Sequence, residues 1–226
     1  MRTTFHAELD RLAAELGAMC ATAGSIMSSA TAAVVYGDMN AADRVWSELS
    51  HLSALNQRVQ DRTLTVLARQ APVARELRFV VSAIRIAGDA DRMGGLAANV
   101  AKVAQRNHPA PAIPSDTTAH FAEMGRVAVE LANRAHHALA DFDADKAREV
   151  GPADREMNDL HRRLFTLVSD ATWTHGAAAA VDVALLGRFY ERFADHAVEI
   201  ARRIVFEATG ETPERTDYEA AMEATL

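Results

Sequence analysis

The sequence predicts an all-α protein made of two tandem, similar three-helix bundles, and three observations carry that prediction. Apolar residues recur at spacings of three and four over very long segments, whereas strand-like alternation is nearly absent. Proline occurs at only six positions in 226 residues. Three of these prolines fall in one short stretch, "NHPAPAIPSD", which is unable to continue a helix and separates two halves of similar pattern.

Three helices are expected in the first half, over residues 4–36, 40–69 and 72–107. The first stops at Gly37, a residue suited to a helix C-terminus. Asn40 is expected to cap the second helix, with Met39 before it in the staple position. Pro72 suits the first turn of the third helix, because its missing N–H is unpaired there anyway.

Three more helices are expected in the second half, over residues 115–140, 143–170 and 178–208. Asp143 follows an apolar residue and should open the middle one. Gly151 and Pro152 should kink or restart that helix. "TGETPERTD" then begins a polar tail.

An internal duplication explains the two halves. When the third and sixth helices are aligned at an offset of 100, size and charge agree at most positions. The pairs include Asp91 with Glu191, Arg92 with Arg192, Gly94 with Ala194, Ala97 with Ala197 and Lys102 with Arg202. The expected boundaries are a first bundle over 1–108, a linker over 109–114, a second bundle over 115–209 and a tail over 210–226.

Composition excludes several classes of protein. The formal charge is −7 and there is no sustained Lys/Arg run, so a nucleic-acid partner is not expected. Cys20 is the only cysteine, which rules out an intrachain disulfide or a cysteine-based zinc cage. The amino terminus lacks a signal-peptide pattern and no uninterrupted apolar run approaches about 20 residues. We therefore expect a cytoplasmic protein, which docking to a membrane complex would still allow.

The sixth helix carries an acidic ladder, which we define as Glu191, Asp195 and Glu199. Members four residues apart differ by about 40° around a helix, so the three carboxylates share one face. Two interpretations compete. Arg188 and Arg192 each precede an acid by three residues, so the face could be a solvated, ion-paired surface. Alternatively, Glu191 and Asp195 hold a hard or borderline cation such as iron, manganese, magnesium or zinc.

The metal interpretation needs further ligands, and the sequence offers several without fixing their direction. Glu156, Asp159 and Asp61 on the middle helices could add carboxylates, and His196 could add a nitrogen. A ferritin-like di-iron enzyme would need a Glu-x-x-His pair on each of two helices. This chain has one such tetrapeptide, at 48–51, and no phosphate loop, nucleophile elbow or metalloprotease helix. A metal-dependent helical enzyme is therefore the alternative rather than the leading hypothesis.

Three stretches of the chain resemble the PhoU family of phosphate-transport accessory proteins, most of all its actinobacterial PhoY branch. They are "TFHAELDRLAAELGAMC", "RQAPVARELRFVVSAIRIAGDADRMG" and "YERFADHAVEIARRIVFEATG". The resemblance covers nearly the whole chain except the tail. It implies two similar three-helix bundles, a cytoplasmic location that extends to the inner face of the membrane through partners, and a homodimer.

The resemblance also implies a function without catalysis. Members of the family are negative regulators of the phosphate-starvation response that link the phosphate ABC transporter ATPase to a sensor histidine kinase. Their recurrent E(D)-x-x-x-D motif, associated with bound metal, maps onto Glu191 and Asp195. In the first bundle only Asp91 matches, because Gly95 stands where the family usually has Asp. A divalent or iron-type metal is therefore expected at Glu191, Asp195 and Asp91, with the second bundle favoured. A further possibility is that the acidic faces dock onto basic patches of the partners.

Overall fold

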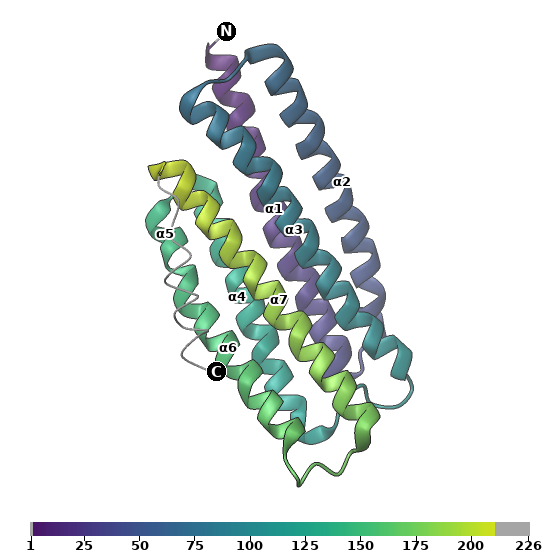
Figure 1. Cartoon of the computed structure of the whole chain (residues 1–226). Coiled ribbons are helices and arrows are strands. Elements are labelled where there is room, and N and C mark those ends of the chain that lie inside the picture. The colour runs from purple at the N-terminus through teal and green to yellow at the C-terminus, as the bar shows by residue number, and fades with distance from the viewer. Residues whose placement is uncertain (1, 211–226) are drawn as a thin grey trace.

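The computed structural model describes residues 2–210, and the side chains of residues 7–69, 71–140, 142–151 and 154–210. This range is helical with no strand (Figure 1). The elements are α1 (Arg2–Tyr36), α2 (Met39–Gln70), α3 (Ala74–Asn107), the short 3₁₀ helix η1 (Ser115–Thr117), α4 (Thr118–Asp141), α5 (Ala144–Arg148), α6 (Val150–Ser169) and α7 (Gly176–Thr209). The expected all-α fold is thus confirmed, while the expected tail from residue 211 onward lies outside the described residues.

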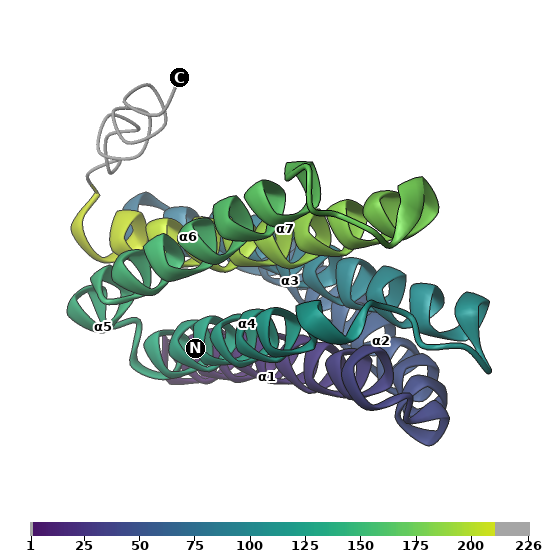
Figure 2. The ribbon, with the colours of Figure 1, turned by 90° about the horizontal axis from the view of Figure 1, so that it is seen from below.

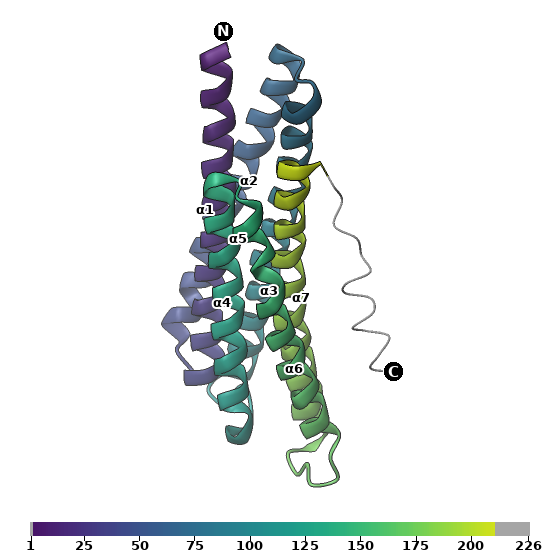
Figure 3. The ribbon, with the colours of Figure 1, turned by 90° about the vertical axis from the view of Figure 1, so that its left-hand side faces the viewer.

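The helices form two antiparallel bundles that share a long interface. α1, α2 and α3 pack together, and α4, α6 and α7 pack together with α5 at one end. Across the interface α1 packs on α4 and α3 packs on α7, so these four helices form the centre of the molecule. Figure 2 shows α1 and α4 along one side and α6 and α7 along the opposite side. Figure 3 shows that the bundles are staggered, so the α2–α3 hairpin extends beyond the end of α7.

Small residues allow the two bundles to approach closely. A Cβ added to Gly125 of α4 would lie 2.5 Å from the Thr31 side chain of α1, and one added to Gly24 would lie 3.1 Å from Ala132 Cβ. Thr31 also shares a hydrogen bond of 2.9 Å with the buried Tyr190 hydroxyl of α7. Because a larger side chain would separate α1 from α4, glycine and alanine in these helices determine how tightly the bundles pack.

α1 is the most apolar helix, and its segment Ala7–Tyr36 is long and apolar enough to cross a membrane by those two criteria alone. Half of its most apolar window is buried within the protein. α1 packs against α2, α3 and α4. Burial of this apolar surface between helices accounts for its composition, as expected for the central helix of a bundle.

The helix ends agree with most sequence expectations, with two corrections. Gly37 follows α1 with a φ of +66°, as expected for a glycine after a helix. The prediction that Asn40 caps α2 was wrong, because Asp38 caps it through a 3.0 Å hydrogen bond from the Ala41 N–H. Pro72 precedes α3 instead of lying in its first turn, since α3 begins at Ala74.

The middle helix of the second bundle is interrupted, as expected. Asp143 caps α5 by accepting hydrogen bonds from the N–H groups of Asp145 and Lys146 at 2.9 and 3.2 Å. The chain restarts as α6 at Val150, just before the glycine–proline pair. The restart changes the direction of the chain, and α6 then packs against α7.

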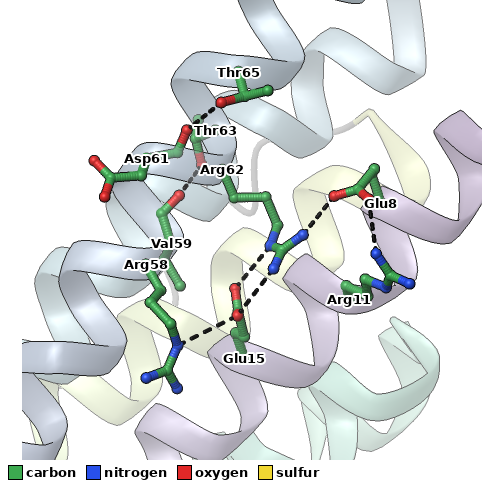
Figure 4. Close-up of polar contacts among 9 residues, drawn as sticks. All are labelled: Glu8, Arg11, Glu15, Arg58, Val59, Asp61, Arg62, Thr63 and Thr65. Atoms are coloured by element: carbon green, nitrogen blue, oxygen red, sulfur yellow. Dashed lines mark hydrogen bonds and ion pairs between the residues drawn. The ribbon is translucent and has the colours of Figure 1, made fainter.

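Ion pairs hold the free end of α1 against α2 (Figure 4). Arg62 of α2 binds Glu8 and also donates from Nε to Glu15 Oε2 at 3.1 Å, while Arg58 Nε lies 3.6 Å from Glu15. The hydrogen bond to Glu15 is the main reason that the pKa of Arg62 rises above its ordinary value. Two glutamates about two helical turns apart thus fix α2 along α1.

Candidate functional site

The acidic ladder lies along α7, and the matching positions of α3 have the same surroundings. Positions 91–100 and 191–200 follow the same order of buried, half-buried and exposed side chains, residue for residue. Asp91 and Glu191 are therefore equivalent in their bundles, as are Gly95 and Asp195. The duplication inferred from residue types thus extends to the way each helix is packed.

Each carboxylate of the acidic ladder has an arginine on its own helix. Glu191 pairs with Arg188, and Asp195 lies 3.8 Å from Arg192. Glu199 binds Arg203 at 2.7 Å and Arg202 at 3.6 Å. The acidic ladder is therefore ion-paired along α7, and Glu199, with two arginines, is the most firmly paired of its members.

Glu191 and Asp195 nevertheless differ from ordinary surface acids. Burial raises the pKa of Glu191, the charge of Asp195 raises it further, and Arg188 and Arg192 oppose the rise. Burial likewise raises the pKa of Asp195, against the effect of Arg192 and Arg188. Since both acids are half-buried on the same face of α7, ionising them together is costly unless a cation is close.

α6 places a third carboxylate, Asp154, near Asp195. The sequence alone did not single out this residue. Asp154 is only 4% exposed. Asn158 donates a 3.1 Å hydrogen bond to its Oδ2, while its Oδ1 is buried without a hydrogen-bond partner. Burial and then the charge of Asp195 raise the pKa of Asp154 to about 6. The position had a sequence signal, because Asp154 interrupts the otherwise core-facing series Val150, Met157 and Leu164.

The carboxylates that the sequence suggested as extra ligands point elsewhere. Glu156 binds Arg126 of α4 at 2.6 Å, and the exposed Asp159 binds Arg162 at 3.1 Å. Asp61 is exposed on α2 and accepts a hydrogen bond from Gln57. None of the three joins Glu191 and Asp195, since helix spacing alone does not reveal which face of α6 or α2 meets α7.

Two histidines near Asp195 make different contacts. His161 of α6 packs against Gly187 of α7, and burial followed by the charge of Arg188 lowers its pKa. His196 turns to the other side of α7, where Nδ1 lies 3.0 Å from Asp89 Oδ1 of α3. Arg203 Nε donates to the other oxygen of Asp89 at 3.2 Å. His196 is thus engaged between the bundles rather than directed at the acidic ladder.

The glycine pair in the first bundle has two separate explanations. A Cβ on Gly94 would lie 2.2 Å from Leu52 Cδ2 and 3.3 Å from Leu49 Cδ1, so α2 packs closely on α3 there and a larger residue would force the Leu52 side chain to move. A Cβ on Gly95 would meet nothing within 4 Å. The Gly95 position therefore has room for a side chain, and the first bundle lacks the carboxylate that Asp195 supplies in the second.

The three predicted ligands lie in two places, one in each bundle, as the resemblance implied. Asp91 lies on α3 of the first bundle, whereas Glu191 and Asp195 lie together on α7. Within residues 2–210 no three His, Cys, Asp or Glu side chains are arranged to hold a metal ion as they stand. Asp195 instead lies near Glu191 of its own helix and near Asp154 of α6, and arginines pair with Glu191 and Asp195.

Sequence comparisons agree with this architecture. A family model described as PhoU domain matches the chain twice, over residues 16–104 and 121–204. The chain is 51% identical over 213 residues to the phosphate-specific transport system accessory protein PhoU homolog 2 of Mycobacterium tuberculosis, covering 94% of this chain and all of the relative. It is 48% identical to PhoU homolog 1 of Mycobacterium leprae, with 95% and 96% coverage.

Solved structures show the same fold. The crystal structure of PhoU from Pseudomonas aeruginosa superposes with a TM-score of 0.79 at 24% identity, covering 92% of this chain and all of that one. The phosphate transport system regulatory protein PhoU from Streptococcus pneumoniae gives 0.81 at 20% identity, with 93% and 99% coverage. With two matches to the family model and close relatives over nearly its full length, this chain belongs to the PhoU domain family.

Proposed function

We propose that this protein is a negative regulator of phosphate uptake and of the phosphate-starvation response. It acts as an adaptor between the ATPase of a phosphate ABC transporter and a sensor histidine kinase. The observation that carries the proposal is the 51% identity to a phosphate-specific transport system accessory protein along that protein's entire length. When phosphate is plentiful, the adaptor favours the inactive state of the kinase and restrains uptake.

The shape of the molecule supports an adaptor. Its long helices offer extended faces, which suit binding to other proteins. A surface hollow of about 420 Å³ lies at the end of α6, lined by Arg162, Phe165, Thr166, Ser169 and Asp170. Asp154, Glu191 and Asp195 do not line this hollow, so they are separate from it. In the proposal the protein works as a homodimer in the cytoplasm and reaches the membrane through its partners.

Deletion of the gene tests this function. In a strain lacking any paralogue, a reporter of phosphate-starvation genes is expected to be expressed in phosphate-rich medium, and a plasmid copy should restore repression. Uptake of labelled phosphate should rise in the same deletion strain. Unchanged reporter expression and unchanged uptake would exclude the proposed role.

A second candidate function is metal binding in the second bundle, and the unpartnered Asp154 Oδ1 favours it. Oxygen donors from Asp154, Glu191 and Asp195 suit a hard cation. The 3.8 Å contact between Arg192 and Asp195 is loose enough for a cation to replace it. A bound cation would offset the charge of the buried Asp154, which has no ion pair of its own among the described residues.

Titration calorimetry with Mn²⁺ and Fe²⁺ tests this candidate on the purified protein. Asp154→Asn and Asp195→Asn are expected to weaken binding by at least about tenfold each, because each removes a charged ligand. Asp159→Asn, an exposed acid on the same helix, is the control and should bind as the unmodified protein does. Equal binding by the unmodified protein and the three variants would show that Asp154 and Asp195 are not metal ligands.

A further inference from the structure

An uncovered apolar stripe runs along the outward side of α3. Val73, Leu77, Val81 and Ile84 are between 41% and 69% exposed. Leu77, Val81 and Ile84, at steps of four and three residues, lie on one side of α3, and Val73 is the residue just before the helix. On the neighbouring helix of the same hairpin, Leu64 of α2 is 64% exposed. More than half of the large exposed apolar side chains in the described residues therefore belong to the α2–α3 hairpin.

Two glycines extend this stripe toward the middle of α3. Gly88 and Gly95 follow Ile84 at steps of four and seven residues, which keeps them on the same side. A Cβ at either position would meet nothing within 4 Å. Each glycine costs about 1 kcal/mol relative to alanine in a helix interior. Close packing within the chain explains Gly94 but neither of these two, whereas a helix from outside could approach closely over them.

The charge around the stripe is opposite to that of the whole protein. Residues 64–95, which span the stripe, contain five arginines and three acids, Glu76, Asp89 and Asp91, although the chain carries a formal charge of −7. Arg85 and Arg92 are exposed beside the stripe, and within the described residues neither forms an ion pair. The stripe is therefore apolar along its centre and basic along the edge of Arg85 and Arg92, while Asp91 lies at its other edge.

The occupant that fits this surface is a helix with acidic edges. Leu77, Val81, Ile84 and Gly88 alternate steps of four and three, the spacing at which one helix packs along another. A second copy packed antiparallel along the same stripe would bring arginine against arginine. Two arginines supply only about 2 kcal/mol of attraction to a membrane of anionic lipids, too little for stable binding. A partner helix with Glu or Asp beside its apolar face satisfies both the apolar surface and the arginines.

Accessibility supports the same surface. The α2–α3 hairpin extends beyond the end of α7 (Figure 3). α7 ends at Gly210, whose added Cβ would lie 3.8 Å from the Arg78 guanidinium carbon. Arg75 still reaches back to Glu207 of α7 at 3.1 Å, and the stripe begins in this first part of α3.

We propose that the α3 seam, defined as Leu77, Val81, Ile84 and Gly88 with Arg85 and Arg92 at its edge, binds an acidic-edged amphipathic helix. That helix belongs to the transporter or the kinase with which the adaptor works. The class of partner rests on the proposed function, whereas the surface and the chemistry of its ligand rest on the contacts and charges of α3.

Photo-cross-linking in phosphate-rich cells tests the seam directly. p-Benzoylphenylalanine is placed at Ile84, and at Tyr36 as a control, which is 78% exposed at the end of α1. The Ile84 probe is expected to cross-link to a transporter or kinase segment that reads as an amphipathic helix with Glu or Asp at its edge. A cross-link to a second copy of this chain, to lipid, or to a segment without acidic edges would overturn the proposal, as would a yield no higher than at Tyr36.

Charge reversal at the edge provides a second measurement. Arg85→Glu combined with Arg92→Glu is expected to lower the cross-linking yield from Ile84 by about tenfold, because opposed charges are replaced by like ones. Arg163→Glu, at an exposed arginine of α6, should leave the yield unchanged. An equal yield from all three proteins would contradict the assigned role of the two arginines.

Substitution of the apolar centre separates this inference from the proposed function. Val81→Glu is expected to release the starvation reporter to the level of the deletion strain, whereas Val181→Glu, at the equivalent exposed position of α7, should retain repression. Circular dichroism and thermal unfolding should match for both variants, because both side chains are already exposed. If deletion releases the reporter but Val81→Glu does not, the regulatory function stands and the α3 seam is rejected.

Discussion

Asp154 occupies a position that the rest of α6 fills with apolar side chains. It is 4% exposed, and one of its carboxylate oxygens has no hydrogen-bond partner. A buried, incompletely satisfied carboxyl group destabilises the folded state when it is ionised. Such a residue persists most readily where it serves a function, and here the nearby Asp195 belongs to the acidic ladder of α7.

Asp154→Asn should change stability in a pH-dependent way. An unfolded aspartate ionises near pH 4, whereas the pKa of Asp154 in the folded protein is about 6. The folded state therefore loses stability as pH rises from about 4 to 6, and the loss remains at higher pH. Urea unfolding at pH 8 should show the variant more stable by roughly 2 kcal/mol, with little difference at pH 4. The same difference at both pH values would contradict the buried carboxyl group as its cause.

Gly94 and Gly95 provide a matched pair of substitutions. Replacing either glycine by alanine gains about 1 kcal/mol of helix propensity. At Gly94 the new Cβ would overlap Leu52 Cδ2, and overpacking of this kind costs about 1–3 kcal/mol. We expect Gly95→Ala to raise the free energy of unfolding and Gly94→Ala to leave it unchanged or lower it, as measured by urea denaturation. A gain of equal size in both variants would mean that α2 and α3 are not closely packed at Gly94.

At the scale of the element, the ends of helices show how neighbouring residues compete for one role. Asp38 and Asn40 are both good N-cap residues near the start of α2. Gly37 ends α1, and Asp38 then has the extended backbone, φ −75° and ψ 94°, that a cap requires. Asn40 lies inside the first turn, where its side chain is exposed. The turn geometry after Gly37 therefore selects the cap.

The two candidate caps should differ in their effect on stability. Asp38→Ala removes the hydrogen bond to the Ala41 N–H and should destabilise the protein by about 1 kcal/mol. Asn40→Ala removes no cap and is expected to change stability by less than about 0.5 kcal/mol. Thermal unfolding of both variants measures the difference. Equal losses would indicate that the helix start is shared between the two residues.

At the scale of the whole molecule, polar contacts at three levels accompany the apolar interface between α3 and α7. Arg75 binds the buried Glu207 at 3.1 Å near one end, and Arg106 and Asn107 bind Asp182 near the other. Between them Asp89 binds His196 and Arg203. The three contacts run in opposite directions along the two helices, so they fix an antiparallel register. The relative position of the bundles thus depends on specific pairs as well as on apolar burial.

Removal of the middle contact should loosen the bundles. Asp89→Ala leaves Arg203 and His196 without their half-buried carboxylate, which is expected to cost about 2 kcal/mol. Hydrogen exchange should accelerate in the central turns of α3 and α7 more than in α2. Asp159→Ala breaks an exposed pair worth about 0–1 kcal/mol and is the control. Unchanged exchange in Asp89→Ala would show that apolar packing alone sets the register.

Much of the fold follows from the sequence because its signals are local. Each of these signals acts within a few residues of the chain: the three- and four-residue spacing of apolar side chains, Gly37 after α1, and the proline-rich stretch. One offset of 100 residues between the third and sixth predicted helices matches Asp91 with Glu191 and Gly95 with Asp195. The structure gives the members of each pair equivalent burial. The acidic ladder was likewise visible, because residues four apart on one helix share a face whatever surrounds that helix.

Spacings of three and four residues and one offset of 100 residues were thus enough to predict the helices, the duplication and the acidic ladder of α7. Which helix faces that ladder could be learned from the packing alone. It placed Asp154 near Asp195, turned Glu156 toward Arg126, and directed His196 to Asp89. The physical reason is that a helix defines its own faces by its repeat, whereas its rotation against a distant helix depends on the packing of both.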